Sequence, residues 1–405
     1  MKFSNATKVI GLDIGSHSVK AVQVVRLGRS MNIEQVGFSK IDRNLLNTDP
    51  VAAHARAIRE SLEDFNVSKS MITAALPGQS VVIRYPRLRD VSVSELDEAI
   101  EQEASQNIPY DLSEVLLDWS LLDQEVEGES TVQKILLVAA KHDVIDQRIQ
   151  FADIAGIEYS ILSVDSLALA DAAEECQFFN KDETVALINI GAASASIHFT
   201  KDGKSNFIRD IGWGSKELVQ AIVKSKRMDF PIAELLLVEE SSSLTGGSRD
   251  DDIVDVQIVD EPESSASSAP SLLDPLENEI GLETATPQAA ESSTLTAGIE
   301  KTSLLETLST PISRLVTEVR RSFDYYEHQL YEHPVERIIL SGGIAHIPLI
   351  SEALSEELGI DDVTVADPSA GAIKMNRRVS LSRGSVQPAQ FMVAVGLAAR
   401  GLSEL

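Results

Sequence analysis

The sequence predicts an α/β protein built from two related lobes, and three short glycine turns support this prediction. Each turn follows an apolar run with the length of a buried strand, and the turns lie at Gly15-Ser16, Gly191-Ala192 and Gly342-Gly343. After the first two turns a second alternating run begins, which is typical of a β-hairpin. Small residues let backbone N–H groups close around an anion. The three turns therefore indicate two halves that face one phosphate-bearing ligand.

The predicted first lobe comprises residues 1–76 and 157–183. Its helix is expected at Val51–Phe65, where apolar side chains recur near one face. In chain order the lobe should contain three strands, this helix, a strand at 71–76, a strand at 159–164 and a helix at 166–177.

A small α+β subdomain is predicted as an insertion in the first lobe, at residues 77–156. It begins where the strand at 71–76 stops at Pro77-Gly78. Its expected elements are a strand at 80–85, a helix at 94–107, strands at 114–124 and 131–140, and a helix at 142–155.

The second lobe is predicted at residues 184–238 and 304–405. A stripe of apolar residues between Leu304 and Phe323 indicates a core-facing helix over 304–331. The other expected elements are two strands around the Gly191 turn, a strand at 207–211, helices at 215–228 and 231–238, a strand at 337–340, a helix at 347–358, a short strand at 363–366 and a helix at 388–400.

The segment 239–303 is predicted to be a long disordered acidic loop. Residues 239–300 hold 15 Asp or Glu and one basic residue, Arg249, so they contribute −14 of the net charge of −28. Such a composition buries too little apolar surface to offset the entropy of ordering. The loop is either a tolerated surface insertion or a docking tail for a basic partner.

The composition excludes several classes of protein. A net charge of −28 argues against nucleic acid as a direct ligand. The single cysteine, Cys176, excludes a disulfide framework and a cysteine-rich metal site. The N-terminus has no apolar signal region, and no run of about 18 apolar residues occurs. We therefore expect a cytoplasmic protein without direct membrane insertion.

The order Asp13-Ile14-Gly15-Ser16, Asn189-Ile190-Gly191-Ala192 and Leu340-Ser341-Gly342-Gly343 resembles the two phosphate motifs and the adenosine motif of the actin-like ATPase superfamily. The stretches 75–86 and 107–115 are similar to the inserted subdomain of the PilM family of type IV pilus assembly proteins. The resemblance covers most of the chain outside 239–303. It implies a two-lobed actin-like (RNase H-like) ATPase fold.

The resemblance also implies ATP and Mg²⁺ as ligands. Asp13 would hold the metal through water, because Mg²⁺ keeps several waters and takes few carboxylates. Lys20 would neutralise phosphate charge, or is a solvated strand residue. The other residues implied at the nucleotide are Gly15, Ser16 and Ser18 from the first turn, Asn189, Gly191, Ala192 and Ser194 from the second, and Gly342, Gly343 and Ile344 from the third.

One residue departs from the superfamily pattern. Asn189 stands where an aspartate usually begins the second phosphate turn, and an amide cannot act as a general base. We therefore expect nucleotide binding with weak or absent hydrolysis. His17, in the first turn, is expected to be a solvent-facing residue rather than a catalytic one.

Three functions remain open at this point. The resemblance favours a scaffold at the cytoplasmic face of the inner membrane, in a type IV pilus or related secretion or competence machine. There it would bind the N-terminal peptide of a PilN-like membrane protein in a groove between the first lobe and residues 77–156. It would also contact other pilus machinery. The alternatives are a filament-forming cell-division actin homologue and a small-molecule kinase, which needs a carboxylate base.

Overall fold

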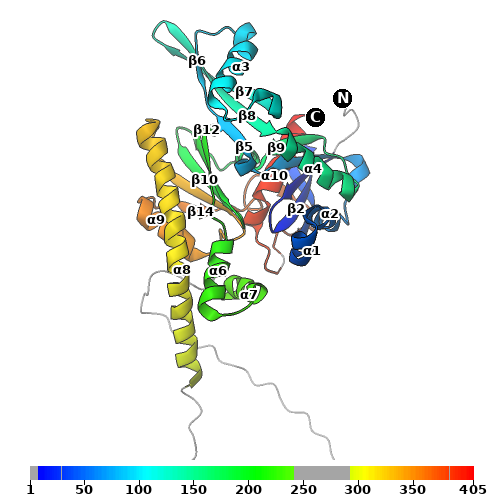
Figure 1. Cartoon of the computed structure of the whole chain (residues 1–405), viewed down its shortest axis with the longest axis vertical. Helices are drawn as coiled ribbons and strands as arrows, with labels where there is room; N and C mark the ends of the chain where they lie inside the picture. Colours follow the sequence, from blue (N-terminus) through cyan, green and yellow to red (C-terminus); the bar gives the residue numbers. More distant parts are fainter. Residues whose placement is uncertain (1–7, 29, 241–291, 383) are drawn as a thin grey trace, which may run out of the picture.

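The computed structural model describes residues 8–28, 30–240, 292–382 and 384–405, apart from the side chains of Val93 and of 292–303. Within these ranges the chain forms two lobes, each built on one mixed sheet (Figure 1). The first sheet has the strand order β15-β3-β2-β1-β4-β9. Its strands are β1 (Lys8–Ile14), β2 (Ser18–Leu27), β3 (Ser30–Lys40), β4 (Ser70–Leu76), β9 (Ile161–Val164) and β15 (Lys374–Met375).

The second sheet repeats the start of the first. Its strand order is β12-β11-β10-β13-β14. The strands are β10 (Thr184–Ile190), β11 (Ala195–Lys201), β12 (Lys204–Ile211), β13 (Arg337–Gly342) and β14 (Val363–Val365). In each lobe the first strand pairs antiparallel with the next and parallel with a later one, β1 with β4 and β10 with β13. The predicted relation between the two halves is therefore visible in the strand pairing.

The insertion forms a separate sheet at the top of Figure 1. In it β8 (Ser130–Lys141) pairs with β5 (Val81–Arg84), β6 (Arg87–Arg89) and β7 (Val115–Glu127). The helix α3 (Leu96–Asn107) covers one face and buries Leu96 and Ile100 against Ile135 and Leu137.

The predicted end of the inserted subdomain at residue 156 is too late. The helix α4 (His142–Ala155) buries Phe151 and Ala155 in the core of the first lobe, against α2 (Pro50–Ser61). The subdomain with its own core therefore ends with β8. The short helix α1 (Arg43–Thr48) precedes α2.

The C-terminal residues lie with the sheet of the first lobe and at the junction, not in the second lobe as predicted. The strand β15 pairs with β3, and α10 (Met392–Ser403) packs on β1 and on α5 (Asp165–Glu175). Because α10 is apolar on every side, it is buried between the two sheets, in a core that also contains Val185 and Leu187 of β10. The helices α5 and α10 thus join the lobes at the base of the space between them.

The remaining helices belong to the second lobe. They are α6 (Lys216–Lys226), α7 (Phe230–Glu240), α8 (Ser292–Asp324) and α9 (Pro348–Leu358). The predicted stripe on α8 is buried from Leu304 to Phe323. However, α8 begins at Ser292, so residues 292–303 are helical and not part of a disordered loop. The rest of the predicted loop, 241–291, lies outside the described residues.

Candidate functional site

A cavity of about 510 Å³ lies between the two lobes. Its size is within the range of small-molecule sites. All twelve residues that the sequence places at a nucleotide line this one cavity. They are Asp13, Gly15, Ser16, Ser18, Lys20, Asn189, Gly191, Ala192, Ser194, Gly342, Gly343 and Ile344.

The first two glycine turns have the same geometry. The Gly15 N–H donates to the Ser18 carbonyl at 3.1 Å, and the Gly191 N–H donates to the Ser194 carbonyl at 3.0 Å. Each turn therefore closes a hairpin over four small or polar positions at the end of a buried strand. The two hairpin tips reach the cavity from opposite lobes, which presents backbone from both sides to whatever the cavity holds.

The third turn packs directly on the second. Gly342 has a φ of +99°, and an added Cβ would lie 2.2 Å from the Ile190 carbonyl oxygen. The next residue, Gly343, donates its N–H to that same oxygen at 3.1 Å. Only glycine tolerates this backbone at residue 342. The contact brings β13 and the end of β10 to one edge of the cavity.

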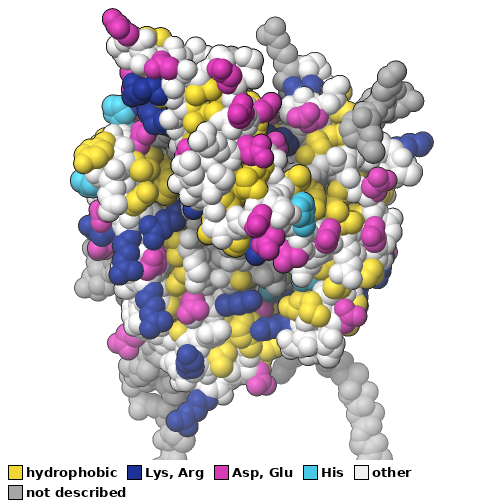
Figure 2. Space-filling model, turned by 45° about the horizontal axis from the view of Figure 1, so that its top comes forward, with side chains coloured by type: hydrophobic (Ala, Val, Ile, Leu, Met, Phe, Trp, Pro, Cys, Tyr) yellow, Lys and Arg dark blue, Asp and Glu magenta, His cyan; other side chains and the backbone are white. Residues whose placement is uncertain are grey.

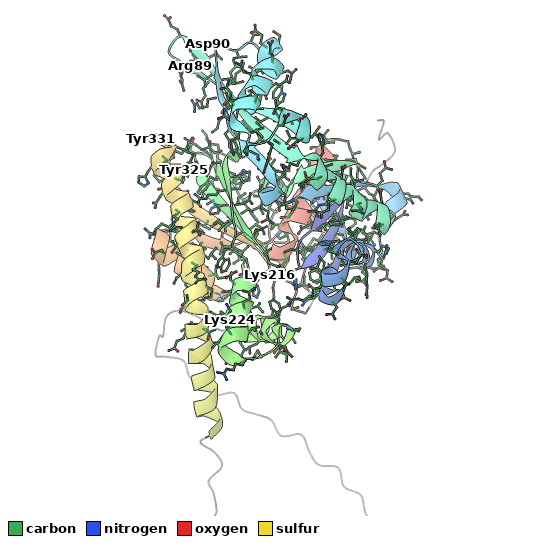
Figure 3. The ribbon with its side chains drawn as sticks, viewed as in Figure 1. Arg89, Asp90, Lys216, Lys224, Tyr325 and Tyr331 are labelled. Carbon is green, nitrogen blue, oxygen red and sulfur yellow. The ribbon has the colours of Figure 1, made fainter. Side chains whose placement is uncertain are left out.

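Basic side chains gather in this cavity although the protein is strongly acidic. Lys20 is a cavity residue rather than a solvated strand residue, and its Nζ lies 3.0 Å from Asp13 Oδ2. Lys216 begins α6 at the side that faces the cavity (Figure 3). The basic residues that line the cavity are Lys20, Lys40, Arg43, Arg148 and Lys216. Four carboxylates line the same cavity, so the five basic side chains exceed them by one. In a strongly acidic protein this local excess of positive charge suits an anionic ligand.

Two partly buried carboxylates that the sequence did not indicate also line the cavity. Asp165 begins α5 and Asp210 lies on β12, and both converge on Gly78, where the chain enters the inserted subdomain. The Gly78 N–H donates to Asp165 Oδ1 at 2.9 Å. A Cβ on Gly78 would lie 2.8 Å from Asp210 Oδ1 and 3.0 Å from Asp165 Oδ1. The sequence offers one signal for Asp165, which lies between the predicted strand at 159–164 and the predicted helix at 166–177.

The surroundings of the two carboxylates favour their neutral forms. Burial, with the nearby charges of Asp210 and Asp13, raises the pKa of Asp165 to about 7. The N–H groups of Gly78 and Ser166 oppose this rise by donating to the carboxylate. Burial also raises the pKa of Asp210 to about 6. Asp165 can therefore exchange a proton near neutral pH.

The raised pKa values predict a stability that falls as the pH rises. Between about pH 4 and pH 7 the folded protein binds more protons here than the unfolded chain, so the free energy of unfolding decreases through this window. Asp165→Asn should be more stable than the unmodified protein at pH 8, on the order of 2–4 kcal/mol, and similar to it near pH 4. Urea unfolding at several pH values measures this difference. The exposed control Asp361→Asn should change little, and a gain from Asp165→Asn that is equal at every pH would contradict this explanation.

Asn189 faces the cavity but supplies no base. Its Oδ1 accepts a hydrogen bond from Ser341 Oγ at 3.3 Å. This contact orients the amide so that its nitrogen remains a donor. Arg148 of α4, which the sequence did not indicate, is buried nearby and donates to the Ile14 carbonyl at 3.1 Å. Its guanidinium therefore lies directly behind the first hairpin.

His17 is partly solvent-facing, as expected, with 36% of its side chain exposed, but it also contacts the other lobe. His17 Nε2 lies 3.3 Å from Glu234 Oε1 on α7, across the cavity from its own lobe. Burial lowers the pKa of His17, and the charges of Lys40, Lys20 and Arg43 lower it further against the opposing effect of Glu234. His17 is thus a neutral contact between lobes at pH 7.

The residues of the cavity suit a magnesium ion that keeps its water ligands. Within the described ranges, no three His, Cys, Asp or Glu side chains are arranged to hold a metal directly. Mg²⁺ bound to a nucleotide needs one or two carboxylates in addition to phosphate and water. Asp13, next to the first hairpin, can serve as such a carboxylate.

Comparisons with known proteins point to one family. The family model for type IV pilus assembly protein PilM matches residues 11–242 and 284–402. A solved PilM-PilN type IV pilus biogenesis complex is 21% identical, with a TM-score of 0.70, and the match covers 97% of this chain and 98% of that chain.

Two further structures have weaker likenesses. The ethanolamine utilization protein EutJ from Carboxydothermus hydrogenoformans is 12% identical, with a TM-score of 0.49 and coverage of 97% of this chain and 89% of that chain. MreB 5 of Spiroplasma citri bound to AMPPNP is 12% identical, with a TM-score of 0.44 and coverage of 98% and 97%.

Proposed function

Because the chain belongs to the PilM family of type IV pilus assembly proteins, we propose that it is an ATP-binding scaffold of a type IV pilus or a related secretion or competence machine. One observation carries the nucleotide part of this proposal. Three glycine turns from both lobes of its actin-like fold meet at one cavity that is lined by five basic side chains. Backbone N–H groups and positive charge together suit a polyphosphate.

The cavity residues divide naturally among the parts of Mg-ATP. In this proposal the hairpin tips at Gly15 and Gly191 receive the β- and γ-phosphates, and Lys20 and Lys216 offset their charge. Gly343 leaves room for the adenosine, since no atom lies within 4 Å of a Cβ placed on it, whereas Gly342 lets the turn pack on Ile190. Asp13 meets Mg²⁺ through a water. The metal would screen phosphate charge and help to orient the phosphates.

The same residues favour binding over rapid turnover. Asn189 cannot take a proton from water, and Asp13 is paired with Lys20. Asp165 has a pKa of about 7, which would suit a general base at neutral pH. However, the N–H groups of Gly78 and Ser166 donate to its carboxylate and hold it at the entrance to the inserted subdomain. We therefore propose slow hydrolysis at most, with the nucleotide serving mainly as a ligand.

The partner part of the proposal rests on apolar surface in and beside the insertion. Among the described residues, thirteen large apolar side chains are exposed, and six of them lie within residues 77–156. These six are Tyr110, Leu116, Leu121, Val126, Ile149 and Ile154. Figure 2, in which the top of Figure 1 comes forward, shows apolar side chains exposed among acidic ones over this part. Concentrated exposed apolar surface marks an interaction site.

One face of the inserted sheet is suited to an extended peptide. The helix α3 covers the face that carries Val115, Leu117 and Leu137. Alternation along the strands places Leu116, which is 56% exposed, on the other face, where it is paired with Ala140. We propose that this face and the first lobe form the groove for the N-terminal peptide of a PilN-like inner-membrane protein.

Such a partner would also set the location of the protein. No helix in the described part of the chain has both the length and the apolar character to cross a bilayer. We propose a cytoplasmic protein that is held at the inner membrane by this partner, where it can also contact other pilus machinery.

Titration calorimetry with ATP tests the nucleotide proposal. We expect saturable one-site binding in the presence of Mg²⁺. Asp13→Asn should bind roughly tenfold more weakly, because it loses the hydrogen bond between a charged carboxylate and a water of the metal. Without Mg²⁺ the two proteins should differ much less. Absence of ATP binding by the unmodified protein, with or without the metal, would refute the proposal.

A further inference from the structure

The two lobes also meet at the cavity, through polar contacts outside their buried junction. Glu234 of α7 accepts a hydrogen bond from Lys40 Nζ at 2.8 Å, and His17 Nε2 lies 3.3 Å from the same oxygen. Beside this pair, the Arg43 guanidinium carbon lies 3.5 Å from the centre of the Phe230 ring. All five residues line the cavity. We call these five residues the clasp.

The clasp differs in kind from the base of the space between the lobes. At the base, α5 and α10 are buried in a continuous apolar core that contains residues of both sheets. Separating the lobes there would expose that core to water. The clasp instead consists of polar and cation–π contacts, and the side chain of Lys40 is 51% exposed. The polar contacts at α1 and α7, which lie below α10 in Figure 1, can therefore break while the apolar junction at α5 and α10 stays closed.

Glu234 is the central member of the clasp. Its side chain is 19% exposed and contacts two first-lobe residues through one oxygen. At neutral pH the positive charge in this contact comes from Lys40, because burial lowers the pKa of His17 and keeps the ring neutral. The clasp thus contains one ion pair, between Glu234 and Lys40, that salt can screen.

We propose that Glu234 and Lys40 form an ionic latch that controls how fast nucleotide enters and leaves the cavity. This inference rests on the proposed binding of nucleotide in the cavity. Closure of the latch holds α7 against the first lobe over the two hairpin tips. Because Ala233 and Leu237 anchor α7 in the core of the second lobe, opening moves α7 together with that lobe away from the first lobe. This motion exposes the cavity, so the latch acts on the rates of exchange more than on affinity. Glu234 is a positioning residue in this role.

Nucleotide exchange in the full chain tests the latch. The protein is loaded with a fluorescent N-methylanthraniloyl ATP and Mg²⁺ and is then mixed with excess ATP in a stopped-flow instrument. Glu234→Gln should accelerate both association and dissociation roughly threefold to fivefold, the size that a partly exposed ion pair supports, and should leave Kd within about twofold. Raising NaCl should accelerate dissociation from the unmodified protein and have a much smaller effect on Glu234→Gln.

Two further variants separate a latch from a general disturbance of α7. Glu239→Gln removes an exposed carboxylate from the same helix and should exchange at the unmodified rate. The charge swap Lys40→Glu with Glu234→Lys should restore slow, salt-sensitive exchange. Equal rates in Glu234→Gln and Glu239→Gln would overturn the latch and leave nucleotide binding intact. Faster dissociation with unchanged association would also overturn it, because Glu234 would then act on the bound nucleotide. No fluorescent binding by the unmodified protein would overturn the latch and the nucleotide proposal together.

Discussion

Replacement of Gly396 by alanine is expected to lower the free energy of unfolding by about 3 kcal/mol. Gly396 lies in α10 where that helix crosses α5, and an added Cβ would lie 1.6 Å from the Ala168 carbonyl oxygen. The neighbour is helix backbone, so it cannot move aside as a flexible side chain could. The same helix touches β1, where a Cβ on Gly11 would lie 1.9 Å from the Ala394 carbonyl oxygen. Both glycines therefore set the distance at which α10 joins the lobes.

Urea unfolding followed by circular dichroism measures this effect. Alanine is a better helix former than glycine by about 1 kcal/mol, so a loss of stability must come from the crossing of the helices. The control is Gly212→Ala, since no atom lies within 4 Å of a Cβ at that position. If Gly396→Ala unfolds at the same urea concentration as Gly212→Ala, the close approach of α10 and α5 does not exist.

Leu116→Lys is expected to weaken binding of the partner peptide by tenfold or more. Leu116 is exposed on the sheet face that α3 does not cover, where it pairs with Ala140, which in turn pairs with half-buried Val81. A lysine there would place a charge in the apolar part of the proposed interface, where a few buried anchors supply most of the binding energy. The fold should survive, because Leu116 belongs to none of the described apolar cores.

The matched control for this variant is Leu27→Lys. Leu27 is 60% exposed at the end of β2, outside the insertion, so it tests the same chemical change on a surface without a proposed partner. Binding of the peptide is followed by calorimetry for both variants. Equal losses of affinity, or no loss for Leu116→Lys, would place the partner elsewhere.

The sequence predicts the strands and glycine turns that flank the cavity, because these elements depend on local patterns. A buried strand that ends at Gly15 or Gly191 and resumes as an alternating run is recognisable without any tertiary context. The stripe from Leu304 to Phe323 likewise requires one buried helix face. The family resemblance predicts that the three turns lie close together, and in the structure residues of all three line one cavity.

The errors concern contacts between segments that are distant in sequence. Nothing near Asp210 indicates that β12 brings it against Gly78 and Asp165. The small, polar neighbours of His17 suggest a solvent-facing turn. They give no sign of its contact with Glu234, because that residue belongs to the other lobe. Chain order also places α10 in the second lobe, whereas its apolar surface on all sides requires burial between both sheets. Patterns in a single sequence define helices and strands, but they do not show which of these elements pack against each other when they are distant in sequence.

We propose that this protein holds nucleotide in the cavity between its lobes and captures a membrane partner through its inserted subdomain. Calorimetric titration of the full chain with the N-terminal peptide of the PilN-like protein from the same genome, with and without Mg-ATP, tests it most directly. We expect one-site binding that Leu116→Lys weakens and Leu27→Lys does not. A peptide that fails to bind the unmodified protein in both conditions would contradict the scaffold account.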